Sequence, residues 1–173
     1  MNITQNVNLN SSQFRQVFVY SAIGFLVPFM LGEPQLLVGS VVNAIIILAA
    51  TSELSLAEAL PIIVLPSVAV MARGLVFGPF TPFLLPMIPF IWAGNAVLFV
   101  GVKMLKKWWA FVPAALAKST LLFSAAYALF SLSVVPAVFL TAMGAFQLVT
   151  ALIGGALALA ASKSGLLRRV RLV

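Results

Sequence analysis

Very few side chains in this sequence of 173 residues can take part in chemistry. The chain contains no Cys and no His, and its three acidic residues are Glu33, Glu53 and Glu58. Zinc, haem and iron–sulfur sites therefore lack their usual thiolate and imidazole donors, and Ser–His and Cys–His nucleophile pairs cannot form. We predict a protein that is not an enzyme and that binds no metal and no cofactor.

Polar side chains inside apolar stretches are the remaining candidates for a site. At a rise of about 1.5 Å per residue, one group falls in the outer third of four different predicted helices: Glu33, Gln35, Arg73 and Gln147. This convergence predicts a substrate-binding pocket that opens outward. Glu33 and Arg73 would form an ion pair or a ligand clamp there, and Trp92 would supply an aromatic wall. The alternative is ordinary exposure of polar side chains at the membrane interface.

A second group of polar residues lies deeper. Asn43, Asn95 and Lys118 each fall roughly 10–15 Å from the inner membrane surface. A basic residue in the middle of a membrane costs about 2.5–3.5 kcal/mol on insertion scales, so Lys118 requires a polar partner or water. We expect these three residues to form one hydrogen-bonded layer between the second, fourth and fifth segments. The layer either serves only to hold the helices together or also binds a ligand.

Four prolines interrupt the entry to the fourth predicted segment: Pro79, Pro82, Pro86 and Pro89. Their spacing places them on one side of a helix, and each proline removes a backbone donor. Carbonyl groups freed in this way must be satisfied by protein or by a water-filled cavity. We predict an irregular backbone that lines the binding cavity. A kinked helix packed against its neighbours is the other interpretation.

The composition indicates that helices in a membrane position these residues. Apolar residues make up 63% of the chain and charged residues 8%, against about a half and about a quarter in a typical soluble domain. This excludes an ordinary water-soluble globule. A spanning helix needs about 20 mostly apolar residues. We therefore predict an all-α integral membrane protein, a six-transmembrane-helix bundle with segments at about 14–32, 35–51, 55–77, 80–102, 108–132 and 135–162.

Basic residues flank the apolar segments and predict their orientation. Arg15 precedes the first segment, a Lys-rich gap lies at 103–107, and a basic cluster ends the chain. The positive-inside rule then places both termini in the cytoplasm, N-in and C-in. The net charge of +7 is thereby explained without nucleic acid as a partner. The predicted divisions are a polar N-terminal tail at 1–13, a membrane domain at 14–165 and a basic C-terminal tail at 166–173.

Small residues recur at helical spacing in the last predicted segment. Gly154-xxx-Ala158 and Ala151-xxx-Gly155 allow two helices to approach closely. We expect this close packing inside the bundle, and packing against a partner protein is the alternative.

The architecture and four stretches of sequence resemble the substrate-binding S component of energy-coupling factor (ECF) transporters, or an S-component-like small prokaryotic membrane protein. The stretches are PQLLVGSVVN at 34–43, LPS at 65–67, GPFTPFLLP at 78–86 and PFIWAGN at 89–95. The resemblance implies an outward-facing pocket that captures a vitamin or related micronutrient, in the cell membrane of a prokaryote. It also implies a transmembrane coupling subunit with ATPases as the partner.

The expected function is therefore that of a membrane-embedded substrate-binding subunit for the uptake of a small molecule. A structural or assembly subunit without cargo is one alternative, and a bundle centre that is packed shut would favour it. A stand-alone small carrier or channel is another, and it requires an oligomer or a continuous polar path across the bundle.

Overall fold

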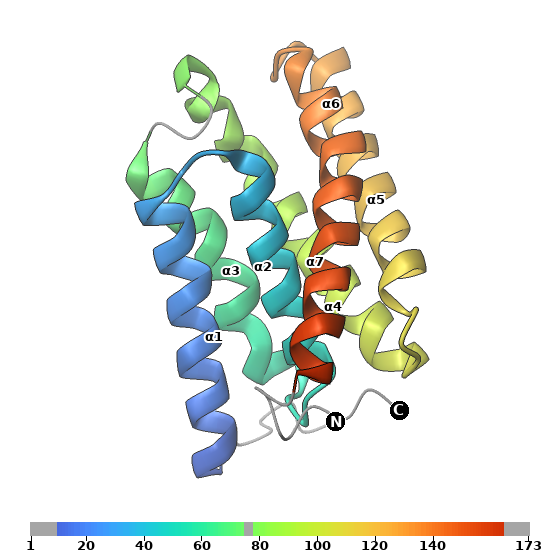
Figure 1. Cartoon of the computed structure of the whole chain (residues 1–173). Coiled ribbons are helices and arrows are strands. Elements are labelled where there is room, and N and C mark those ends of the chain that lie inside the picture. The colour runs from blue at the N-terminus through green and yellow to red at the C-terminus, as the bar shows by residue number, and fades with distance from the viewer. Residues whose placement is uncertain (1–9, 75–77, 165–173) are drawn as a thin grey trace, which may run out of the picture.

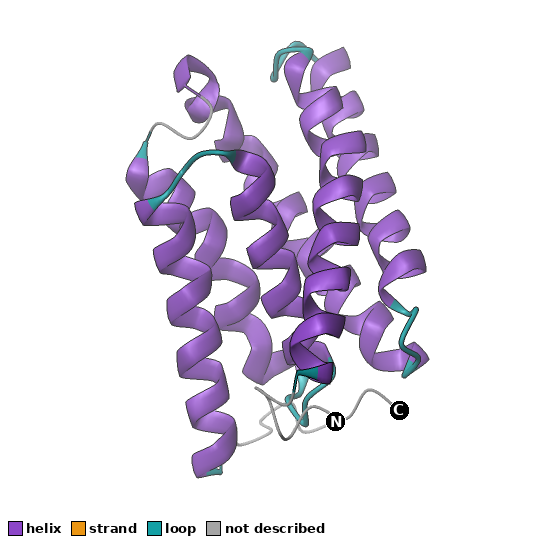
Figure 2. Cartoon of the chain, in the orientation of Figure 1, coloured by secondary structure: helices purple, strands orange, loops and turns teal. Residues whose placement is uncertain are grey.

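The computed structural model describes residues 10–74 and 78–164, and these residues are almost entirely helical (Figure 1). No strand occurs within these two ranges, and the connections between helices are short (Figure 2). The elements in chain order are α1 (Ser11–Met30), α2 (Gln35–Ala50), α3 (Leu56–Arg73), the 3-10 helix η1 (Gly78–Met87), α4 (Ile88–Leu105), α5 (Phe111–Ser131), α6 (Val138–Met143) and α7 (Ala145–Lys163).

Polar caps and a glycine set the ends of α1 and α3. The side-chain oxygen of Asn10 accepts hydrogen bonds from the backbone nitrogens of Ser12 and Gln13, at 3.1 and 2.9 Å. This cap starts α1 at Ser11, so residues 11–13 of the predicted tail belong to the helix. At the other boundary, Gly74 has a φ of +80° and ends α3. The third segment is therefore shorter than the predicted 55–77.

The proline-rich segment has an irregular backbone, as its composition predicts. Residues Gly78–Met87 form the 3-10 helix η1, which leads directly into α4. A 3-10 helix of this length is uncommon. Because each proline lacks a backbone N–H, the segment cannot complete the hydrogen-bonding pattern of a regular α-helix.

The last predicted segment is divided into two helices at Gly144. A Cβ atom at this position would lie 2.9 Å from the carbonyl oxygen of Leu140 and 2.9 Å from the Phe123 ring of α5. Only glycine allows the backbone to pass this close to α5 while it turns from α6 into α7. Hydropathy does not register such a break, because the residues on both sides of Gly144 are apolar.

Four helical stretches are long and apolar enough to cross a membrane: Leu56–Arg73, Phe80–Leu105, Phe111–Ser131 and Val138–Lys163. The sequence predicted six such spans, so the described structure supports four of them by this measure. The helix α2 has 16 residues, which gives a length of about 24 Å against a hydrocarbon core of about 30 Å. The helix α1 begins with a polar stretch that includes Gln13, Arg15 and Gln16.

The outside of the bundle is strongly apolar. Phe14, Phe18, Met30 and Leu85 are each more than 60% exposed, and many further large apolar side chains lie on the surface of the same helices. Soluble monomers rarely expose contiguous apolar patches of more than a few hundred Å². This surface and the four apolar stretches define a multi-pass, helical-bundle membrane protein.

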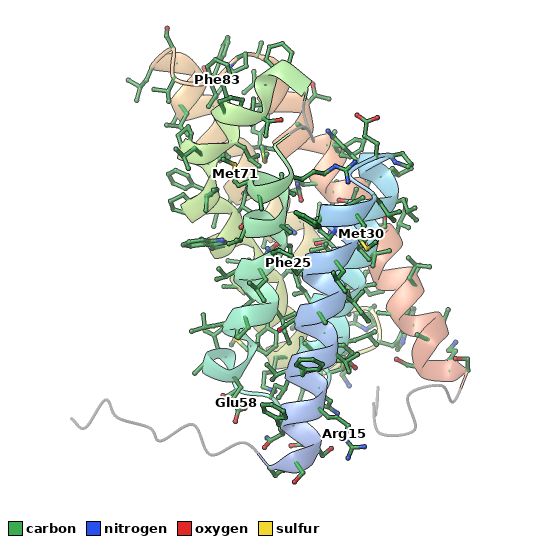
Figure 3. All side chains as sticks on the ribbon, turned by 90° about the vertical axis from the view of Figure 1, so that its left-hand side faces the viewer. Arg15, Phe25, Met30, Glu58, Met71 and Phe83 are labelled. Atoms are coloured by element: carbon green, nitrogen blue, oxygen red, sulfur yellow. The ribbon has the colours of Figure 1, made fainter. Side chains whose placement is uncertain are left out.

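The end of the bundle where α1 begins and α7 ends is here called the lower end, as in Figure 1. The first turn of α3 contains Glu58, and the last turns of α4 and α7 contain Lys103 and Lys163. Arg15 and Glu58 lie toward this end, whereas Phe83 lies at the other, upper end (Figure 3). A large core of buried residues from α2, α3 and α4 fills the lower part, and a smaller one from η1, α5 and α6 fills the upper part.

Candidate functional site

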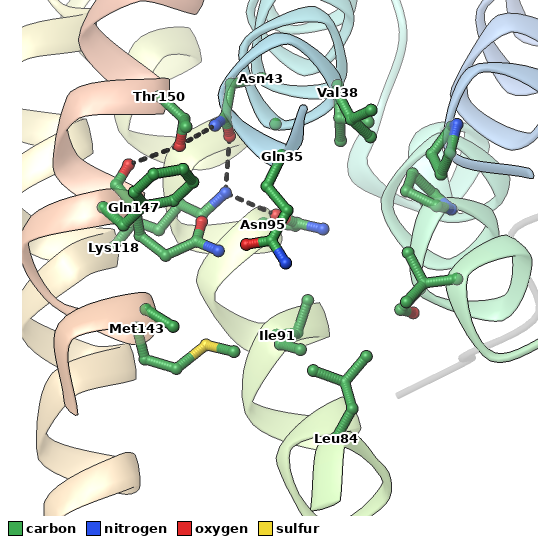
Figure 4. A pocket seen from close by; sticks show the side chains of 18 of the residues that line it. Gln35, Val38, Asn43, Leu84, Ile91, Asn95, Lys118, Met143, Gln147 and Thr150 are labelled. Carbon is green, nitrogen blue, oxygen red and sulfur yellow. Dashed lines mark hydrogen bonds between the residues drawn. The ribbon is translucent and has the colours of Figure 1, made fainter. Parts of the chain in front are cut away.

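A cavity of about 120 Å³ lies among the helices, and each helix of the described bundle contributes to its wall. The wall runs from Gly32, in the α1–α2 turn at the upper end, down to Lys118 in the bundle interior. Most of the lining is apolar. All but one of the polar side chains in the lining gather on one side of the cavity (Figure 4): Gln35, Asn43, Asn95, Lys118, Gln147 and Thr150.

Lys118 is the centre of this polar group. Its Nζ donates hydrogen bonds to Oδ1 of Asn43 at 2.6 Å and to Oδ1 of Asn95 at 2.8 Å. All three residues are no more than 2% exposed. The layer expected from the depth of these residues therefore exists as a set of direct contacts between α2, α4 and α5. The amide oxygens partly offset the cost of burying the ammonium group.

The two asparagines are held by further bonds that point away from Lys118. Nδ2 of Asn43 donates to Oγ1 of Thr150 at 3.2 Å, and Nδ2 of Asn95 donates to the carbonyl oxygen of Ile63 at 3.0 Å. Each amide therefore turns its oxygen toward Lys118 and its nitrogen toward an acceptor. These bonds extend the layer to α7 and α3, so five helices meet at this point.

Small neighbours on α5 make room for the long side chain of Lys118. Ala114, Ala115 and Ser119 share the buried face of this helix with Lys118. Residues four apart lie above one another on a helix, so Ala114 and Leu122 flank Lys118 along the helix axis. The amino group of Lys118 reaches the asparagines of the neighbouring helices.

The predicted outer group divides between the cavity and the surface. Gln35 and Gln147 line the cavity together with Lys118 and the asparagines. The polar layers that the sequence placed at two depths thus contribute to a single site. Thr150 and Ser67 also line it and were not predicted. The sequence signal for Thr150 was its position three residues after Gln147, on the same helical face.

Glu33 and Arg73 lie outside this cavity. Nη1 of Arg73 donates to the carbonyl oxygens of Phe29 and Met30, each at 2.6 Å. Arg73 therefore binds the last carbonyl groups of α1, where a cation is favourable. Among the described residues Arg73 forms no ion pair with Glu33, whose side chain is exposed. The expected ion pair is therefore absent from the described part of the chain, and neither residue lines the cavity.

Replacement of Arg73 by Ala is expected to lower the free energy of unfolding by about 1 kcal/mol, because two carbonyl groups lose a charged donor but remain within reach of water. Thermal unfolding in detergent measures this loss, and Arg73→Lys should recover part of it. Binding in the cavity should be unchanged. Loss of a cavity ligand in Arg73→Ala would instead support the role of a ligand clamp.

The cavity lining does not include Trp92, Pro82, Pro86 or Pro89. Nε1 of Trp92 donates to Oγ of Ser67 at 2.6 Å, so Trp92 positions a lining residue. Pro82 and Pro89 are exposed and Pro86 is half-buried. The side chain of Pro79 lies outside the part of the chain that the structure describes. The proline-rich segment and α4 instead contribute Leu84 and Ile91 to the wall.

Comparison of the chain with protein-family models, with curated proteins and with solved structures gave no match. The function is therefore argued from the site alone.

Proposed function

We propose that this membrane protein binds a compact small molecule in the cavity beside Lys118. The observation that carries the proposal is the convergence of buried polar side chains from α2, α4, α5 and α7 on one cavity with mostly apolar walls. A cavity with a few convergent polar groups among apolar ones is the usual form of a small-molecule site. A bundle held together only by hydrogen bonds does not require the open space.

The volume of the cavity limits the size of the ligand. It measures about 120 Å³, somewhat less than the cavity of about 150 Å³ that holds benzene in an engineered protein. The ligand we propose therefore has a buried part of about six heavy atoms. This size favours the small end of the micronutrient class implied by the resemblance to S components.

The proposal includes orientation and uptake. We propose that all six segments cross the cell membrane of a prokaryote, with both termini in the cytoplasm. The cavity then runs from the outer end of the bundle toward its middle, because its wall reaches from the α1–α2 turn to Lys118. A protein of this form would capture its ligand from outside and deliver it with an ATP-driven coupling subunit. Co-purification from native membranes tests that partner independently of ligand binding.

Native mass spectrometry of the protein released from detergent tests ligand binding. Ala142 lines the cavity, so Ala142→Leu fills part of it with an isopropyl group. We expect a bound small molecule on the wild-type protein, and a decrease in its occupancy of about tenfold or more in Ala142→Leu, because a filled cavity cannot hold the same ligand. Ala145→Leu is the matched control, since Ala145 is exposed.

Two results would contradict the proposal. One is a wild-type protein that carries no small molecule and gains no thermal stability from any fraction of a cell extract. The other is a bound molecule whose occupancy is the same in wild type, Ala142→Leu and Ala145→Leu. Either result, combined with recovery of a stable protein partner, would favour a structural subunit.

A further inference from the structure

We propose that the ligand of this cavity is a compact organic carboxylate, whose anionic group pairs with the ammonium group of Lys118. This inference rests on the proposed function, because it assigns a chemical class to the ligand of the same cavity.

The first argument is one of charge. Lys118 is 2% exposed, and its nitrogen faces two amide oxygens at the short distances typical of charge-assisted hydrogen bonds. Amide groups that point their oxygens toward a cation stabilise it, but they carry no net charge and so do not neutralise it. The only carboxylate side chains of the chain are Glu33, Glu53 and Glu58, and none of them lines the cavity. We infer that the anion that balances a protonated Lys118 belongs to the bound ligand.

The second argument is one of donors. An ammonium group has three N–H donors and no acceptor, and Asn43 and Asn95 take two of them. Lys118 lines the cavity, so the third donor is available to a group bound there. The side-chain amide of Gln147 lines the same cavity and has no hydrogen-bond partner among the described residues. Lys118 and Gln147 thus offer a carboxylate bound in this cavity one donor each.

The third argument concerns the rest of the ligand. The apolar part of the cavity wall includes Val38, Val42, Val70 and Ile91. Such a wall favours a ligand with an apolar body. One lysine balances one negative charge. A doubly charged phosphate group would keep an unbalanced charge in an apolar site, which is strongly unfavourable. A small monoanion with a hydrocarbon body satisfies both the charge and the wall.

The experiment compares acids with uncharged analogues of the same shape. Isobutyrate is paired with isobutyramide and benzoate with benzamide, and each is titrated calorimetrically into the wild-type protein at constant ionic strength. We expect each carboxylate to bind at least about tenfold more tightly than its amide, because only the carboxylate carries a negative charge that balances the ammonium group. Lys118→Met should remove this preference, so that each acid no longer binds the variant more tightly than its amide.

The outcomes separate the ligand class from the proposed function. Equal affinity for acid and amide in the wild-type protein overturns the carboxylate proposal and leaves the cavity a binding site. So does a preference for the acid that persists in Lys118→Met. If Lys118→Met does not fold, the relative affinities of acid and amide for the wild-type protein still test the carboxylate proposal. If none of the four probes binds, the ligand released from the native protein is identified by mass spectrometry. A ligand without an acid group overturns the carboxylate proposal. Absence of any cargo contradicts the proposed function itself.

Discussion

Asn95→Leu is expected to destabilise the protein by about 3 kcal/mol, because the buried ammonium group of Lys118 loses a hydrogen bond, and a bond to a charged group contributes about 1.5–3 kcal/mol. Nζ of Lys118 would retain only its bond to Asn43, and the Ile63 carbonyl oxygen would lose the amide of Asn95. Leucine is similar to asparagine in size, so little of the effect comes from lost volume. Thermal or denaturant unfolding in detergent measures the loss.

The double variant Lys118→Met/Asn95→Leu separates the charge from the packing. The double variant removes the buried charge but leaves the oxygens of Asn43 and Ile63 without these donors. We therefore expect it to regain part of the stability that Asn95→Leu loses. Ser124→Leu is the control, because it places the same side chain on the exposed face of α5. A double variant that is no more stable than Asn95→Leu would show that Lys118 is not the source of the effect.

The second large effect is expected for Gly154→Ala. A Cβ atom at Gly154 would lie 2.7 Å from Cβ of Asn43 and 2.8 Å from both the Ala44 nitrogen and the Ser40 carbonyl oxygen. Two of these three atoms belong to the backbone of α2, so α2 and α7 would have to move apart. Overpacking of this kind costs about 1–3 kcal/mol, and the shift would also move Asn43 away from Lys118.

Gly24→Ala is the matched control for this clash. A Cβ atom at Gly24 would meet its nearest neighbour, Cγ of Pro66, at 3.5 Å, which is an ordinary contact. Alanine is favoured over glycine inside a helix by about 0.5–1 kcal/mol, so Gly24→Ala should be neutral or stabilising. Equal unfolding temperatures for the two variants would contradict the close contact between α2 and α7.

Hydropathy and helical rise predicted much of the site. Apolar runs located the helices, and distance along each helix placed Asn43, Asn95 and Lys118 at one depth, where they meet. Depth does not give direction around the helix axis. Arg73 and Gln35 have similar predicted depths, yet Arg73 binds the end of α1 and Gln35 faces the cavity. This direction depends on how the helices pack against one another.

Other features had no counterpart in the hydrophobic pattern. The break at Gly144 depends on how closely α6 passes α5, which is a property of the folded bundle. The small residues predicted to allow close approach do so inside the bundle, where Gly154 meets α2 and Gly155 meets the ring of Phe111. The predicted lining role of the proline side chains could not have been judged from spacing, because a 3-10 helix rotates them differently from an α-helix.

The order of Lys118 and its partners along the chain matters during synthesis. A ribosome makes the chain from its N-terminus, and Asn43 and Asn95 precede Lys118 by 75 and 23 residues. Both acceptors are therefore already synthesised when α5 enters the membrane. Lys118 can therefore form its hydrogen bonds to the two asparagine oxygens as α5 inserts, without first exposing its charged group to lipid. Thr150 arrives last, with α7, and fixes Asn43 from the other side.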